Sequence, residues 1–474
     1  MEEQPIVIIG GGMSGLAAAI RLARFGRRTI VLEKHTRLGG LNSFYYRQGR
    51  LFETGLHAMT NYAGPEDRSA PLNRLFRQLK LSRKAFQTHE QLGSEIRFPS
   101  QSLRFTNDFS CLSDEICAKF PNSANGLAKL TEFVKQYDPF SKRPWLSARQ
   151  SLNAFIPDPL LIEMLLCPLM IYGNSQEDDM DLAQFVIMFQ AVFLEGFFRP
   201  AGTIRDFLNL LQNHYQALGG EIRFKAGVDS LLVRDNQVFG VRLANGEEIL
   251  AETVVSTIGA VGTMALLADS LSGEQDDYVG RLSFVESIYL LPQAAMPGIQ
   301  HDATCIFFSD RDQFVYRRPL EPMDLEVGVI NFPSNFQGLP SSDLVQVRVT
   351  HPANYEIFRQ ADLDAANGRS GQYLEMKKAW QERSLAKIGK KIGNFSQNIV
   401  YQDTFTPLTI ERYSGKAAGA VYGSPLKVKD GLTRYRNLLL AGTDQGFLGI
   451  VGAMLSGVTI VNQHILTTSG PESG

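Results

Sequence analysis

The residues with the clearest chemical use are three glycines near the start of the chain and the acid that follows them. Gly10, Gly12 and Gly15 have the spacing GxGxxG, and Glu33 lies 21 residues after Gly12. Glycines at this spacing form a tight turn, let the backbone approach a pyrophosphate and let a helix pack closely on a strand. A carboxylate at that distance accepts from a ribose hydroxyl. The pattern predicts a dinucleotide site, and the alternative is a tight structural turn.

The elements around these residues have the order that such a site needs. The apolar run 6–9 is typical of a buried strand, an Ala- and Leu-rich helix follows as far as Gly26, and a second strand over 29–32 ends at Glu33. The N-terminus of that helix would offer free N–H groups to phosphates. The local sequence therefore predicts a Rossmann-like strand, turn, helix and strand.

Further candidates for chemistry follow the second strand. Gly39 and Gly40 allow close backbone approach to a ligand, and Glu53, Gly55 and His57 lie in an apolar setting. His57 is the best candidate for a catalytic polar group, since its pKa suits proton transfer near neutral pH, and the alternative is a satisfied core histidine.

Other polar residues are weaker candidates, and no nucleophile is evident. Glu195 and Tyr422 are secondary active-site candidates, whereas Glu53 and Arg412 are expected to be structural partners that hold loops together. Ser14 belongs to the phosphate turn and not to a GxSxG elbow, so hydrolysis is not expected.

Composition restricts the class of protein. A chain of 474 residues is expected to form two or three structural units, and a formal net charge of −2 gives no indication of nucleic-acid binding. The four cysteines lack metal-ligand spacing, so no metal site is expected and a reducing compartment fits. With no signal segment recognised and no apolar run of roughly 20 residues, we expect a cytoplasmic protein, with peripheral contact to the cytoplasmic face of a membrane left open.

The middle of the chain is expected to cover a substrate. The region 65–199 is rich in helix signals, and Asp181 with Gln184 resembles a capping box at the start of a helix. Because 185–194 is apolar on nearly every side, this helix is either a central core helix or the lining of an apolar tunnel. A charged helix over 372–392 has five lysines that either face solvent or meet acidic lipids.

The later segments return to the nucleotide unit. A helix with an apolar stripe over 204–218 precedes strands expected at 221–224, 230–233, 238–243, 247–250 and 253–256. Near the C-terminus, the apolar run after Asn437 leads into a glycine-rich turn, 442–452, and a helix of small residues. This second strand, turn and helix would place a helix N-terminus near Ile450.

Together these motifs resemble the FAD-binding segments of the flavin amine oxidase superfamily, and most closely the branch of phytoene desaturases, carotenoid isomerases and retinol saturases. The resemblance implies an α/β fold whose Rossmann-like FAD-binding domain is discontinuous, 1–64, 200–281 and 405–474, with a mixed sheet-and-helix substrate domain from 65–199 and 282–404. It implies that FAD is bound by Gly10, Gly12, Ser14, Gly15, Glu33, Lys34, Gly39, Gly40, Leu41, Gly55, His57, Val228, Gly442, Asp444, Gly449, Ile450 and Val451.

Three activities are compatible with these segments. The first is a desaturase, saturase or cis/trans isomerase that moves a hydride between a flavin and an apolar carotenoid, isoprenoid or retinoid, with the electron partner unidentified. The second is amine oxidation, for which no cysteine follows Cys305 to attach a flavin covalently near the C-terminus. The third is a non-catalytic function, in which the protein binds and escorts a lipid. A protein of this kind has no use for an intact nucleotide site.

Overall fold

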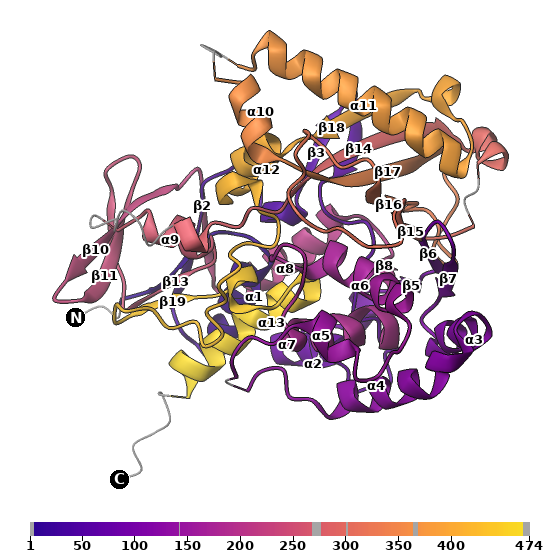
Figure 1. Ribbon diagram of the computed structural model, residues 1–474. Helices are drawn as coiled ribbons and strands as arrows, with labels where there is room; N and C mark the ends of the chain where they lie inside the picture. The colour runs from indigo at the N-terminus through magenta and orange to yellow at the C-terminus, as the bar shows by residue number, and fades with distance from the viewer. Residues whose placement is uncertain (1–3, 142, 268–275, 300–301, 364–367, 468–474) are drawn as a thin grey trace.

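The computed structural model describes residues 4–141, 143–267, 276–299, 302–363 and 368–467 (Figure 1). The two largest sheets have five and seven strands, three smaller sheets accompany them, and helices pack against both large sheets. The fold is α/β, as expected from the sequence.

The first sheet is parallel throughout, and its five strands come from distant parts of the chain. Its order is β19-β13-β1-β2-β9, and each neighbouring pair is parallel. The predicted strands at the N-terminus, at 221–224 and at 253–256 are confirmed. The strands are β1 (Ile6–Ile9), β2 (Thr29–Glu33), β9 (Glu221–Phe224), β13 (Thr253–Ser256) and β19 (Leu438–Leu440).

Alternation of side chains explains why both faces of this sheet are covered. Ile6 and Ile8 pack with the helices on one face, whereas Val7 and Ile9 pack with a three-stranded antiparallel sheet on the other. Successive residues of a strand point to opposite faces, so an entirely apolar strand is expected where both faces are buried. The covering elements are α1 (Met13–Ala23), α8 (Ile204–Ala217) and α13 (Gly449–Val461) on one side and β10 (Val228–Arg234), β11 (Gln237–Leu243) and β12 (Glu248–Leu250) on the other.

The second sheet has seven strands in the order β18-β14-β17-β16-β15-β6-β7. The edge strand β7 and its neighbour β6 belong to the region that sequence patterns indicated as helical, so that region contributes to the sheet as well. The strands are β6 (Ser94–Arg97), β7 (Ser102–Phe105), β14 (Ser283–Pro292), β15 (Cys305–Ser309), β16 (Val327–Asn331), β17 (Leu344–Ala353) and β18 (Tyr401–Phe405).

The long helix α11 (Gly371–Ile392) covers one face of the second sheet (Figure 1). Its Ile388 and Ile392 pack in one hydrophobic cluster with Val347 and Val349 of β17. The charged helix expected over 372–392 is therefore confirmed, and its apolar stripe explains its attachment. The opposite face is covered in part by a group of helices and in part lines a cavity.

A group of helices packs beneath the second sheet. Their side chains share one large core with β6, β7, β15 and β16. The group comprises α3 (Phe109–Lys119), α4 (Ala124–Gln136), α5 (Ala148–Leu152), α6 (Pro159–Gly173) and α7 (Leu182–Phe189), which continues as a π-helical turn over Gln190–Leu194. The remaining elements are β3 (Phe44–Arg47), β4 (Arg50–Glu53), α2 (Pro71–Leu79), β5 (Thr88–Glu90), β8 (Phe198–Pro200), α9 (Ala260–Met264), α10 (Tyr355–Ala361) and α12 (Pro407–Ser414).

The cap of α7 differs from the capping box expected there. The Asp181 carboxylate accepts from the backbone N–H of Ala183 and does cap the helix. No reciprocal hydrogen bond from the backbone N–H of Asp181 to the side-chain oxygen of Gln184 accompanies it, and the amide nitrogen of Gln184 is buried without a partner. Half of the expected reciprocal pair is present, so the helix start is confirmed and the capping box is wrong.

Among the described residues, one helical stretch, 449–466, is long and apolar enough to span a bilayer by length and composition. Half of it is buried inside the protein. A Cβ added to Gly457 would lie 2.1 Å from the backbone oxygen of Ser14, so the small residues of α13 allow close contact with α1. This packing accounts for its apolar composition.

Candidate active site

The first glycine turn has the geometry that its sequence indicates. Gly10 has φ +100°, and a Cβ added to Gly15 would lie 2.0 Å from the carbonyl oxygen of Gly10. No side chain fits at Gly15, so α1 approaches β1 only because that residue is glycine. The Glu33 carboxylate closes the turn by accepting from the N–H groups of Gly11 and His35, each at 2.9 Å.

The start of α1 fits a phosphate-bearing ligand. A Cβ on Gly12 would meet no atom within 4 Å, and the buried hydroxyl of Ser14 has no hydrogen-bond partner. Open space, an unpaired hydroxyl and the free N–H groups of a helix N-terminus together suit an anionic group. Gly442 has φ +112° and lies beside Ser14, with 3.8 Å from its added Cβ to the serine Cβ, so the second glycine turn meets the first.

The adenosine end of such a ligand has a natural place at the end of β2. The N–H of Ala226 donates to the carbonyl oxygen of Glu33 at 2.9 Å, and a Cβ on Gly227 would lie 3.5 Å from the Cβ of Lys34. Val228 begins the next strand directly after them. The expected neighbours Glu33, Lys34 and Val228 are therefore together, and the turn, the acid and this segment can hold a dinucleotide such as FAD.

A cavity of about 650 Å³ lies between this nucleotide region and the open face of the second sheet. Its walls come from the loop after β2, from the segment 54–60, from β14, β16 and β17, from α12 and from the start of α13. Six of the residues expected at the cofactor line it: Gly40, Leu41, Gly55, His57, Gly449 and Ile450. The other expected residues do not line the cavity. Some lie beside the nucleotide turn or in the core, and six lie at the turn itself: Gly10, Gly12, Ser14, Gly15, Glu33 and Gly39.

Asp444 does not face this cavity. Its two carboxylate oxygens accept from the N–H groups of Ser424, at 2.9 Å, and Ala260, at 2.6 Å. Burial raises the pKa of Asp444, but Lys416, Lys427 and the two amides outweigh this effect and hold that pKa below its ordinary value. Asp444 therefore ties loops together in this structure, and its expected part in binding FAD stays a prediction.

Thr443, which sequence reasoning missed, lines the cavity next to Asp444. Its hydroxyl accepts from Lys416 Nζ at 2.7 Å. Val451 also departs from expectation, because its side chain is buried in the core that α1 and α13 share, which leaves only its backbone to serve a ligand. Neighbouring side chains in a turn or at a helix start point in different directions. Residue type alone does not reveal which of them faces the cavity.

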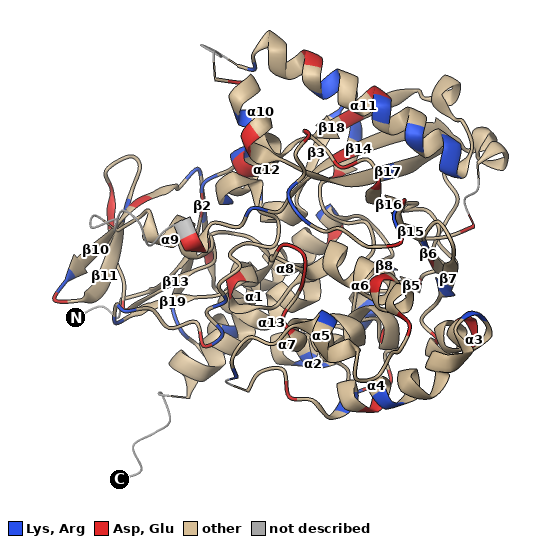
Figure 2. Ribbon diagram, viewed as in Figure 1, with Lys and Arg blue, Asp and Glu red and all other residues tan. Residues whose placement is uncertain are grey.

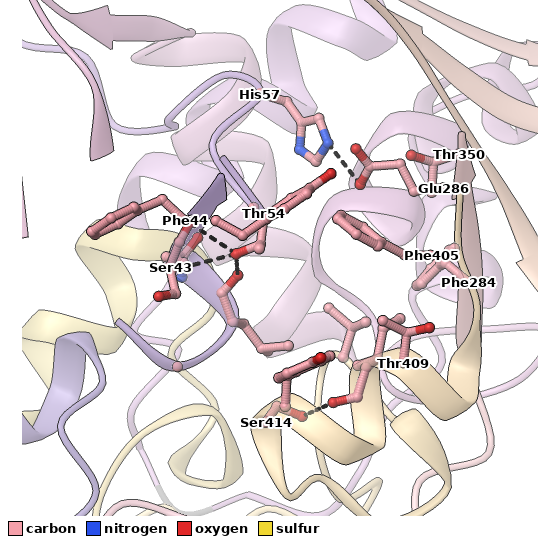
Figure 3. Close-up of a pocket in the computed structure, with 18 of the residues that line it drawn as sticks. Ser43, Phe44, Thr54, His57, Phe284, Glu286, Thr350, Phe405, Thr409 and Ser414 are labelled. Carbon is pink, nitrogen blue, oxygen red and sulfur yellow. Dashed lines mark hydrogen bonds and ion pairs between the residues drawn. The ribbon is translucent and has the colours of Figure 1, made fainter. Parts of the chain in front are cut away.

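His57 faces a carboxylate that sequence patterns did not indicate. Its Nε2 lies 3.0 Å from Oε2 of Glu286 on β14, and both residues line the cavity (Figure 3). Burial raises the pKa of Glu286, but the Arg348 guanidinium and then His57 outweigh burial and lower that pKa below its ordinary value. Glu286 is therefore ionised at neutral pH, and His57 lies beside it at the cavity wall, where a catalytic role for this histidine stays a prediction.

Arg348 holds the carboxylate of Glu286 in place. Its side chain is fully buried on β17, and its Nε donates to Oε1 of Glu286 at 2.5 Å. Its Nη2 contacts the same carboxylate and donates to the carbonyl oxygens of Glu53, at 2.9 Å, and Thr54, at 3.2 Å. The second sheet is thus joined by charge to the segment that leads into His57.

Glu53 is structural, as expected, but its partner is not Arg412. Its carboxylate pairs with the buried Arg199 and accepts from the N–H of Ile204 at 2.6 Å. The guanidinium of Arg412 instead lies 5.7 Å from the ring centroid of Tyr413, at the cavity wall. The ion pairs of Glu53 and Glu286 involve four segments that are far apart in sequence: 53–57, the segment with Arg199, β14 and β17.

The rest of the cavity wall is largely apolar. Ile171, Met188, Phe284, Val329 and Phe405 line it. From the apolar run 185–194, only Met188 does so among the described residues. Phe185, Phe189 and Phe193 are fully buried and contact one another, so this helix is mainly a core helix and not the lining of a tunnel.

The two weaker candidates have different outcomes. Glu195 is not among the residues lining the cavity and accepts from Asn61, at 2.8 Å, and Gln190, at 3.0 Å, while burial raises its pKa. Tyr422 does line the cavity, but its hydroxyl donates to the carbonyl oxygen of Ile171 at 2.6 Å, and burial raises its pKa above the ordinary range. Glu195 is therefore structural, and Tyr422 contributes its ring.

Basic residues recur along α11, with acidic residues among them (Figure 2). Lys387 and Lys391 both pair with Asp310, and Lys378 lies 3.9 Å from Glu382. Lys377 lines the mouth of the cavity. Ion pairs therefore occupy part of this basic face, and across the described residues no group of three or more histidines, cysteines or acids could hold a metal ion.

Comparisons with known proteins agree with this geometry. The family model described as "Flavin containing amine oxidoreductase" matches residues 13–289. The chain is 24% identical to a chloroplastic prolycopene isomerase of Daucus carota, over 91% of this chain and 74% of that one, and 23% identical to the all-trans-retinol 13,14-reductase of Danio rerio, over 98% and 87%. A solved oxidoreductase of Methanosarcina mazei superposes with a TM-score of 0.66 at 16% identity, over 97% of this chain and 100% of that one.

Proposed function

The chain belongs to the flavin-containing amine oxidoreductase family and is an FAD-dependent enzyme, and we propose that it changes a double bond in an apolar polyene, a carotenoid, isoprenoid or retinoid. The reaction is desaturation, saturation or cis/trans isomerisation. FAD, when bound, accepts or delivers the hydride. The chain's own residues position the substrate, exclude water and control charge and protons.

One observation supports this proposal above the others. A cavity with mainly apolar walls holds a single histidine–glutamate pair, His57 and Glu286, beside the nucleotide region. A long apolar molecule fits such walls, since pockets of this kind gain binding from apolar contact and orientation from a few polar groups. The relatives named as a prolycopene isomerase and a retinol reductase support the same class of substrate.

The electrostatic role of the pair follows from its surroundings. Loss of a hydride from an allylic carbon leaves positive charge spread along a polyene. Arg348 keeps Glu286 ionised, so a fixed carboxylate faces the cavity, where low dielectric strengthens its attraction for such charge. Because the carboxylate is held in place before reaction, no reorganisation is needed when the charge develops.

His57 is the residue that exchanges a proton with the substrate. Its Nε2 faces Glu286, and its ring lies at the cavity surface with 18% of the side chain exposed. A histidine at the cavity wall is suited to exchange a proton with a carbon of the substrate through a ring nitrogen. Saturation needs such a proton in addition to a hydride, whereas isomerisation needs only transient charge. The pair thus serves each of the three outcomes.

The test is an absorption spectrum of the flavin-loaded protein during anaerobic addition of phytoene, lycopene or retinol. Bleaching of the oxidised flavin supports desaturation, and a change in the polyene only after prior flavin reduction supports saturation or isomerisation. Glu286→Gln should lower turnover by about 10²-fold or more with flavin content unchanged. The matched control is Glu195→Gln, which alters a half-buried glutamate outside the cavity wall and should keep turnover.

Other results would overturn the proposal. If no polyene reacts in either flavin redox state and an amine bleaches the flavin instead, the enzyme is an amine oxidase. If a polyene binds without reaction in either state, the protein is an escort. Full turnover by Glu286→Gln would remove the proposed role of the ion pair.

A further inference from the structure

One side chain in the cavity wall has a hydrogen-bond donor with no partner. Asn331, the last residue of β16, is 2% exposed and lines the cavity. Its Oδ1 accepts from the hydroxyl of Tyr172 at 3.1 Å and from Sγ of Cys305 at 3.1 Å. Its Nδ2 is buried and has no hydrogen-bond partner. A buried amide donor without an acceptor is uncommon in proteins and is costly to maintain.

The two neighbours fix which end of the amide faces the ligand. Burial raises the pKa of Cys305 to about 12 and raises the pKa of Tyr172 well above its ordinary value, so both groups keep their protons at neutral pH. Both can therefore donate to Oδ1, and the NH2 group of Asn331 is turned away from them. With both hydrogen bonds made to Oδ1, the group of Asn331 that has no partner is a donor.

The position of Asn331 separates it from the charged pair. In the sheet, Glu286 is paired with Thr350, and Thr350 with Val329, which lies two residues before Asn331. Two strand spacings across and two residues along correspond to about 12 Å between the backbones of Glu286 and Asn331. An elongated ligand is long enough to span that separation.

We propose that Asn331 donates, through Nδ2, a hydrogen bond to an uncharged oxygen at one end of the substrate, a hydroxyl or a carbonyl. The inference rests on the proposed function for the apolar remainder of the molecule. It narrows the substrate class to oxygenated polyenes, with the oxygen remote from the bond that reacts near His57 and Glu286. The donors Tyr172 and Cys305 act as positioning residues that hold the amide in this orientation.

The test compares three probes that share one polyene skeleton: retinol, retinal and the hydrocarbon that lacks the oxygen. Their dissociation constants are measured on the flavin-loaded protein, in the dark and without reductant, from the change in polyene absorbance. The wild type should bind retinol and retinal about tenfold more tightly than the hydrocarbon, the factor that a neutral hydrogen bond typically supplies. Asn331→Leu, of similar size and without a donor, should reduce that ratio to about one while the hydrocarbon binds as before.

A second variant guards against misfolding. Tyr172→Phe removes one of the groups that orient the amide and should lower the ratio by a smaller factor, with flavin content unchanged. If the wild type binds all three probes equally, or if Asn331→Leu leaves the ratio unchanged, the inference is overturned and the proposed function stands. If none of the three probes and no longer polyene binds, the proposed function fails, and the inference fails with it.

Discussion

Replacement of Arg348 by methionine is the most direct test of the charge arrangement at the cavity. The variant keeps a long side chain but removes the guanidinium that contacts Glu286 and the carbonyl oxygens of Glu53 and Thr54. Glu286 would then remain buried with only His57 beside it. Removing one partner of a buried ion pair typically costs about 3 to 5 kcal/mol, because the other charge is left without compensation.

The expected shift in melting temperature follows from chain length. An unfolding entropy of about 2.1 cal/mol/K per residue amounts to ~1 kcal/mol/K for the whole chain, so Arg348→Met should lower the melting temperature by about 3 to 5 °C if the chain unfolds as one unit. The measurement is scanning calorimetry of the flavin-loaded protein, at several scan rates. The same change at Arg242, whose pair with Glu248 is about half exposed, is the matched control and should cost less than about 1 kcal/mol.

A double-mutant cycle separates the pair from other effects of the substitution. Glu286→Gln should be costly alone but much less so when Arg348 is already methionine, with a coupling free energy of about 2 kcal/mol. Additive effects of the two substitutions, or a melting temperature for Arg348→Met equal to that of the Arg242 control, would refute the account of Glu286 as a carboxylate held by Arg348.

Two further predictions concern the nucleotide turn and acid stability. Gly15→Ala should lower the melting temperature of the flavin-free protein, because the added Cβ would lie 2.0 Å from the carbonyl oxygen of Gly10. Gly12→Ala should fold normally and lose flavin, because its Cβ enters open space at the start of α1. Equal melting temperatures of the two variants would contradict this reasoning. Burial lowers the pKa of His351 to about 4, below the ordinary 6.5, so the unfolded chain binds more protons between these values and stability falls as pH falls from 6.5 to 4. The loss is about 3 kcal/mol, measured by urea unfolding, and His351→Phe should remove that part of the pH dependence; an unchanged slope in the variant would show that another group is responsible.

Much of the nucleotide region could be predicted because its signals are local. The strand at 6–9, the glycine turn, the helix and Glu33 occur within about thirty residues, and each one restricts the backbone by itself. The same holds for the late strand and the helix that begins at Gly449. The helix over 372–392 was also predictable, since its charged and apolar residues repeat at the helical period.

The polar residues of the cavity could be predicted only in part. His57 was indicated by its place after Gly55, but Glu286, Arg348 and Asn331 lie inside strands far along the chain. A signal did exist, because Glu286 and Arg348 are charged residues within otherwise apolar strands, and such residues need buried partners. Their partners could not be named, because strand register decides which residues meet across a sheet.

The amino-acid sequence by itself determined the elements, the glycine turns and the kind of ligand that they suit, since backbone conformation there depends on neighbours a few residues away. Tertiary structure alone decided that Thr443 and not Asp444 faces the cavity, that Met188 lines it while Phe189 is buried, and that His57 meets Glu286 across more than two hundred residues. The physical reason is that a side chain acquires its direction, its dielectric surroundings and its charged neighbours only when distant strands and helices pack together.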